Sequence, residues 1–267
     1  MLFQRLVWSG LAAAVIVGSL QTGVQRWQAV PIIQAAEAYE SQKTQAPTMA
    51  ASHDTAKAHS HAHDAAPAWE PAEGVERTFW SWVANLLHAF SMALLVFVAM
   101  GVGLWRGASM RSMPLAALVA AAGALSFHVW PSLGLPAEIP GMDAARLGSR
   151  QGWWVLAAGC AALACAGVAG LRTAWRWPVA AALLALPFII GAPHIAADPF
   201  AGFGTEAQAA LRALDARFVV ATNWIALSFW VSMAVVCGVL FERWLRPAID
   251  AGSGRTRIAP TALELKP

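Results

Sequence analysis

Six long apolar stretches constrain this chain more than any other feature of its sequence. A helix rises about 1.5 Å per residue, so about 20 apolar residues cross the hydrocarbon layer of a bilayer. Backbone polar groups find no water in lipid, so each crossing segment has to be a helix. The sequence therefore predicts an all-α, polytopic transmembrane helix bundle. The expected spans run approximately over residues 6–24, 79–105, 114–133, 152–171, 177–195 and 218–241.

Two of the six spans are weaker predictions, because the third and the fifth run into proline-containing segments at 130–136 and 191–194. Proline has no amide hydrogen and interrupts a helix. Five spans is therefore the alternative to six. The first stretch follows Arg5 and resembles a signal peptide. No small-x-small cleavage site comes directly after it, so we expect an uncleaved helix.

The composition excludes one large soluble domain. Charged residues make up 12% of the chain and apolar residues 58%, whereas a soluble domain has about 25% charged residues. The cations do not form a basic stripe interleaved with aromatic residues, so nucleic acid is not an expected partner. The cysteines lie in apolar runs and are expected to be buried, without disulfides or a zinc site. They are Cys160, Cys165 and Cys237.

The distribution of arginine predicts the orientation in the membrane. The short connections near 106–113 and 172–176 each carry two arginines, and short cationic loops stay in the cytoplasm. With six spans, both termini are then cytoplasmic. The transmembrane domain is expected over residues 1–247, with a long outer loop at 25–78. We expect the middle of this loop and the polar tail at 248–267 to be disordered.

A histidine-rich tract lies in the middle of the outer loop. Imidazole is a common ligand for cobalt, nickel, zinc and copper ions, and carboxylates add oxygen ligands. A flexible segment could fold several rings around one ion, so the tract predicts metal capture with loose binding and fast exchange. The alternative is a polar or pH-sensitive linker. The candidate ligands are His53, His59, His61, His63 and Asp64.

Two further histidines stand near the ends of the third and fifth stretches. These are His128 and His194, and Glu138 follows just beyond the third stretch. By the predicted topology all three lie at the outer membrane boundary, where nitrogen and oxygen ligands would suit a borderline divalent cation. The alternative is that these side chains simply reach water.

Four residues of the second stretch share one face of a helix, because they are spaced by four, three and four. They are Ser81, Asn85, His88 and Met92. Polar groups in lipid normally face the bundle interior and mark a functional path. The alternative is hydrogen bonding that only holds helices together.

Glu37 and Glu40 lie three residues apart and share a face if the first helix extends through them. Paired carboxylates can bind cations or perform acid–base chemistry. The alternative is a solvated helix face.

Several catalytic motifs are missing from the sequence. It contains no Gly-x-x-x-x-Gly-Lys-Ser/Thr phosphate loop, no His-Glu-x-x-His zinc-protease motif and no Gly-x-Ser-x-Gly nucleophile elbow. We therefore expect neither enzymatic activity nor a tightly bound cofactor. Energy for any transport would come from a partner, from an ion gradient or from the gradient of the substrate itself.

Several ordered segments resemble one known family along most of the chain. The matching segments are residues 31–40, 69–78, 84–85, 127–128, 131–141, 150–154, 191–194 and 221–223. In these segments the chain resembles the CbtA family, the proposed cobalt transporter subunit of bacteria. The resemblance implies a multi-pass subunit of the inner membrane, with about five spans and a histidine-bearing loop between the first two. It also implies a small single-span partner, CbtB, and a link to cobalamin supply.

The resemblance and the candidate ligands together favour a membrane subunit for Co²⁺ uptake. In this interpretation the outer loop collects the ion, and the bundle passes it along a polar path. Nickel or zinc would suit the same ligands. The alternative is a metal-binding or assembly protein of the membrane that does not transport.

Overall fold

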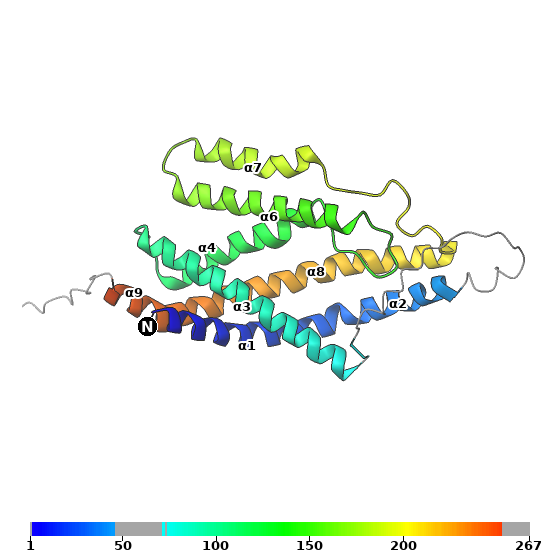
Figure 1. Cartoon of the computed structure of the whole chain (residues 1–267), viewed down its shortest axis with the longest axis horizontal. Coiled ribbons are helices and arrows are strands. Elements are labelled where there is room, and N and C mark those ends of the chain that lie inside the picture. The colour runs from blue at the N-terminus through cyan, green and yellow to red at the C-terminus, as the bar shows by residue number, and fades with distance from the viewer. Residues whose placement is uncertain (1, 46–70, 73, 253–267) are drawn as a thin grey trace, which may run out of the picture. The chain divides into compact units, whose positions relative to one another are not determined.

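The computed structural model describes residues 2–45, 71–72 and 74–252, and all regular structure in these ranges is helical (Figure 1). This confirms the predicted all-α fold. Two π-helical turns interrupt the α-helices, at Leu125–Val129 and Phe241–Leu245. The α-helices are α1 (Leu2–Gln28), α2 (Val30–Gln45), α3 (Val75–Trp105), α4 (Ser112–Ala124), α5 (Trp130–Ser132), α6 (Leu147–Gly170), α7 (Arg176–Ile190), α8 (Thr205–Leu240) and α9 (Arg246–Gly252).

Five helical segments are long and apolar enough to cross a membrane. The shortest of them has 21 residues, which corresponds to about 30 Å and matches the hydrocarbon thickness of a bilayer. The chain is therefore a multi-pass membrane protein. The five segments are Leu2–Gln28, Val75–Trp105, Ser112–Ser132, Leu147–Gly170 and Thr205–Ala251.

The remaining apolar stretch forms α7, which is shorter than the span predicted over 177–195. This helix has 15 residues, or about 22 Å, which is less than the hydrocarbon thickness. It ends at Ile190 because Gly191 takes the left-handed conformation with φ of +88° and donates its amide to the Pro187 carbonyl at 3.0 Å. The structure thus supports five full-length spans. This is the alternative to six that the proline-containing segments at 130–136 and 191–194 had left open.

Helix α7 lies antiparallel beside α6 (Figure 1). The Trp153 Nε1 near the start of α6 donates to the carbonyl of Pro187 near the end of α7, at 2.9 Å. The Trp130 Nε1 donates to the Leu184 carbonyl at 3.1 Å. These hydrogen bonds hold α7 in place although it is short.

The described residues divide into two compact units. One is built from residues 2–19, 85–120 and 231–252, and the other from residues within 20–84 and 121–230. In the first unit α1 approaches α3 closely. A β-carbon added at Gly18 would lie only 3.0 Å from the carbonyl oxygen of Asn85. Small residues that allow such contact are typical of helix pairs in membranes.

The second unit contains α2, and a buried cluster joins this helix to the loops and to α8. Helix α2 is separated from α1 at Ala29, since Pro31 has no amide hydrogen to continue the helix. The cluster comprises Ile32, Ala36, Ile139, Phe200, Leu211 and Ala221. The outer loop predicted over 25–78 therefore begins with an ordered helix that is packed against the rest of its unit.

At the other end of the sequence, the helix continues through Gly252 and so includes the first residues of the tail predicted over 248–267. The rest of that tail lies outside the described residues. So does the histidine-rich tract, with His53, His59, His61, His63 and Asp64.

Candidate metal-ion site

One histidine–asparagine pair lies between helices of the second unit. His128 belongs to the π-helical turn Leu125–Val129, in which the Trp130 amide donates to the Leu125 carbonyl. Pro131 follows and cannot donate to a regular helix, which accounts for the irregular turn. The Nε2 atom of His128 lies 3.0 Å from Oδ1 of Asn223, on α8. Such turns inside α-helices are frequent at functional sites.

The asparagine of this pair is itself fixed by its own helix. Asn223 Nδ2 donates to the Val219 carbonyl at 2.8 Å, and the neighbouring Thr222 hydroxyl donates to the same carbonyl at 2.9 Å. The side chain of Asn223 is solvent-exposed in the isolated chain, whereas the His128 ring is half-buried. In a bilayer the pair would lie in lipid-bordered surroundings, where unpaired polar groups are costly.

The other two residues of the predicted outer site do not join this pair. Glu138 forms an ion pair with Arg150 at 2.5 Å, and both side chains are about one quarter exposed, at 26% each. His194 is exposed in the segment that follows α7. Across residues 2–45 and 74–252, no three His, Cys, Asp or Glu side chains are grouped so that they could hold a metal ion. The expected convergence of His128, His194 and Glu138 is therefore not present, and their roles as ligands stay predictions.

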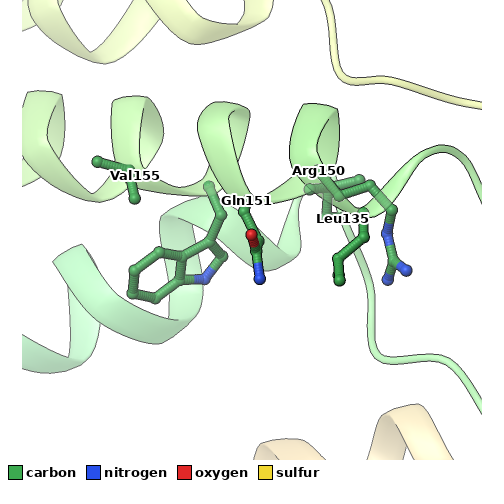
Figure 2. Close-up of a pocket in the computed structure, with 6 residues that line it drawn as sticks. Leu135, Arg150, Gln151 and Val155 are labelled. Carbon is green, nitrogen blue, oxygen red and sulfur yellow. The ribbon is translucent and has the colours of Figure 1, made fainter. Parts of the chain in front are cut away.

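A shallow groove beside α6 contains the partner of Glu138. Figure 2 shows the Arg150 and Gln151 side chains on the same side of that helix. The groove is mostly apolar and its one charged group is a cation, which would repel a metal ion. We therefore do not regard it as the ion site. It is lined by Leu135, Leu147, Arg150, Gln151, Trp154 and Val155.

The acidic pair on α2 forms contacts with the rest of the protein. Because α2 is helical through both positions, Glu37 and Glu40 share a face, as predicted. The Glu37 carboxylate receives two hydrogen bonds from the Arg77 guanidinium, at 2.6 and 3.2 Å. This geometry indicates a structural tie between α2 and the start of α3. A role for Glu37 and Glu40 in ion binding stays a prediction.

The polar stripe of α3 lies on one continuous helix, as its spacing predicted. Ser81 donates its hydroxyl to the Arg77 carbonyl at 2.7 Å and so is satisfied within the helix. His88 is exposed and stands beside the buried face, which includes Ala89 and Ala93. His88 therefore borders the packed interior of the first unit and is not enclosed in it. The ion-binding role of His88 stays a prediction.

The sequence analysis missed Asp215. This residue lies on α8 just before the expected span at 218–241, and its Oδ1 atom is buried without a hydrogen-bond partner. Asp215, Val219 and Asn223 are spaced by four, so they lie on one face of the helix. The spacing of eight residues between Asp215 and Asn223 was the signal available in the sequence.

The three cysteines carry no disulfide in the structure. Cys160 and Cys237 are buried and Cys165 is half-buried. Their surroundings are apolar helices, which agrees with the expected role as small hydrophobic side chains.

The fold and these scattered polar residues define a multi-pass α-helical membrane protein. The chain belongs to the CbtA family, described as a probable cobalt transporter subunit, which matches residues 3–242. The match includes every candidate site residue and confirms the resemblance. Since the family is described as a subunit, at least one further subunit is implied. No curated protein and no solved structure matches the chain.

Proposed function

We propose that this chain forms the membrane passage of a Co²⁺ uptake system, with His128, held by Asn223, as the ion's contact between helices of the bundle. The protein would lie in the bacterial inner membrane. Both termini would lie in the cytoplasm if the short apolar helix α7 completes a sixth crossing. It would work with a small single-span CbtB-like subunit and supply cobalt for cobalamin. Nickel or zinc would suit the same ligands, because geometry and availability rather than affinity separate these metals.

The hydrogen-bonded pair of His128 and Asn223 carries this proposal. Polar side chains within apolar helices are costly and mark ion pathways in membrane proteins. An imidazole nitrogen is a suitable ligand for a borderline divalent ion. The chain belongs to the family of probable cobalt transporter subunits. Co²⁺ is therefore the most direct candidate for the bound ion.

Transport requires that the ion bind and then leave. A resident structural metal normally has a closed set of four protein ligands. The pair contributes one imidazole, which the amide of Asn223 holds in place. An ion bound there would keep other ligands, such as water, and exchange readily. Asp215 lies two helical turns from Asn223 on the same face of α8. Its partnerless oxygen supports a role in attracting the cation along this face.

The histidine-rich tract would supply the ion to this path. His53, His59, His61 and His63 would raise the local concentration of Co²⁺ at the outer surface, with Asp64 as an oxygen ligand. His194, Glu138, Glu40 and His88 complete the candidates along the route, whereas Glu37 is engaged by Arg77. Loose capture by a histidine-rich tract agrees with a role in collection.

Uptake of radiolabelled Co²⁺ into proteoliposomes tests the proposal. The chain is reconstituted with its small partner, and His128→Ala is compared with Val129→Ala as the matched control. Val129 follows His128 in the same turn and is an exposed apolar residue. We expect His128→Ala to lower uptake at least tenfold and the control to keep it. Wild-type uptake in His128→Ala would contradict the proposed path.

The arginine pairing of Glu37 and Glu138 gives some support to the second candidate function, a metal-binding or assembly protein that does not transport. The same vesicles separate the two. Binding of Co²⁺ without accumulation inside vesicles, with the partner present, would favour this second function.

A further inference from the structure

The hydrogen bonds of Asn223 fix the orientation of its amide group. Nδ2 lies 2.8 Å from the Val219 carbonyl oxygen and donates to it. In the reversed orientation Oδ1 would face that carbonyl, and two acceptor oxygens would repel each other at this distance. The Oδ1 atom therefore faces His128, where Nε2 lies 3.0 Å away.

This orientation decides which nitrogen of His128 carries the proton. An amide oxygen only accepts hydrogen bonds, so Nε2 must donate. A neutral imidazole has one N–H, and the other nitrogen presents a lone pair. Within the described part of the chain, the Asn223 contact is the only hydrogen bond of the His128 ring. The lone pair of Nδ1 is then available.

We propose that Asn223 is a positioning residue that holds His128 as the Nε2–H tautomer and leaves Nδ1 to bind the divalent cation. This inference rests on the proposed function, since it names the ligand atom of the same site. It agrees with a general feature of metal-binding histidines, which almost always donate their other ring N–H to an oxygen atom.

The backbone explains how the ring is held for this task. The π-helical turn, which ends at Val129, places His128 three residues before Pro131 and opposite α8. Nδ1 is the ring nitrogen nearer to the main chain, so an ion bound there lies close to this irregular turn. Backbone that departs from a regular helix within a membrane is tolerated where it is buried or lines a cavity. The binding atom is thus directed toward the turn and the donor atom toward Asn223.

The tautomer is tested by ¹⁵N NMR of the full-length protein, labelled at histidine and reconstituted in nanodiscs without metal. The His128 signals are identified by their loss in His128→Gln. We expect one protonated nitrogen, Nε2, and one unprotonated nitrogen, Nδ1. Addition of Zn²⁺, a diamagnetic substitute for Co²⁺, should shift the Nδ1 signal. An Nδ1–H tautomer would overturn the inference, and so would a ring that does not respond to the metal.

Two variants separate positioning from simple loss of structure. Asn223→Leu removes the acceptor, so we expect mixed tautomers and a roughly 10- to 100-fold loss of metal affinity. Thr222→Val is the control, because the Thr222 hydroxyl donates to the same Val219 carbonyl and, among the described residues, is not hydrogen-bonded to His128. It should keep a single tautomer. A single Nε2–H tautomer in Asn223→Leu would contradict the positioning role.

Failure of this inference differs from failure of the proposed function. The NMR signals do not depend on transport, because they are recorded on protein in nanodiscs. A metal-responsive Nδ1 in a protein that takes up no Co²⁺ into vesicles would reject transport and keep the ligand assignment. Uptake that depends on His128 in a protein with an Nδ1–H ring would keep the transport proposal and reject the ligand assignment.

Discussion

The carboxylate of Glu37 on α2 receives two hydrogen bonds from the guanidinium of Arg77 on α3, the shorter at 2.6 Å. The two residues are separated in the sequence by the histidine-rich tract, which lies between α2 and α3. Their pairing joins the two ends of the segment that holds the tract. The ends of the proposed ion-collecting segment are therefore fixed to one another within the second unit.

Removal of this ion pair should have a small effect. The side chains are 36% and 34% exposed, so solvent screening limits the pair to about 1 kcal/mol. Glu37→Gln should lower the melting temperature in detergent slightly and leave Co²⁺ affinity unchanged. Calorimetric titration measures that affinity. A large loss of affinity with unchanged melting would instead make Glu37 an ion ligand.

The contact between α1 and α3 predicts a stability effect at Gly18. A β-carbon there would meet backbone atoms of Asn85 and Leu86 at 3.0 Å, and backbone cannot move aside as a flexible side chain can. Gly18→Ala should destabilise the protein by about 1–3 kcal/mol through overpacking. Gly23→Ala is the matched control on the same helix, because no atom lies within 4 Å of the added carbon. Thermal unfolding in detergent compares the two, and equal melting temperatures would reject close contact at Gly18.

The Asp215 carboxylate, whose Oδ1 atom is buried without a hydrogen-bond partner, predicts a transport effect without a folding defect. Asp215→Asn removes the charge and keeps the shape. Co²⁺ uptake should therefore fall several-fold, while the free energy of unfolding stays within about 0.5 kcal/mol of the wild-type value. Glu206→Gln, in the exposed first turn of α8, is the control. Vesicle uptake at low Co²⁺ concentration is the measurement. Unchanged uptake in Asp215→Asn would remove this residue from the path.

The histidine-rich tract predicts a change in concentration dependence. Replacement of His53, His59, His61 and His63 together by alanine should raise the Co²⁺ concentration needed for half-maximal uptake. The maximal rate should remain, because collection precedes the path through the bundle. A full concentration series of initial uptake rates measures both quantities. Identical curves for the variant and wild type would reduce the tract to a spacer.

The helices and their approximate places could be predicted because the information is local. An apolar run of about 20 residues has no stable alternative to a helix in lipid. Local signals also explain the one shortened element, since Gly191 and Pro193 stop α7 before the predicted end at 195.

The candidate site could be predicted only in part. His128 could be predicted as a candidate ligand from the sequence, because a lone imidazole at the end of an apolar stretch is rare and costly in lipid. Its hydrogen-bond partner could not be predicted, since Asn223 lies 95 residues away in the sequence. Glu138 was expected beside His128, but the fold pairs it with Arg150. Charge alone does not say which of several nearby partners a carboxylate will meet.

The sequence by itself determined that this protein is a helical bundle of the membrane, and it limited the ion ligands to a few side chains. Only the tertiary structure decided that His128 faces Asn223, that Glu37 is tied to Arg77 and that Asp215 has an oxygen without a partner. The physical reason is that helix formation in lipid depends on each segment's own apolar length. The partners of polar groups depend on how separate helices pack against each other.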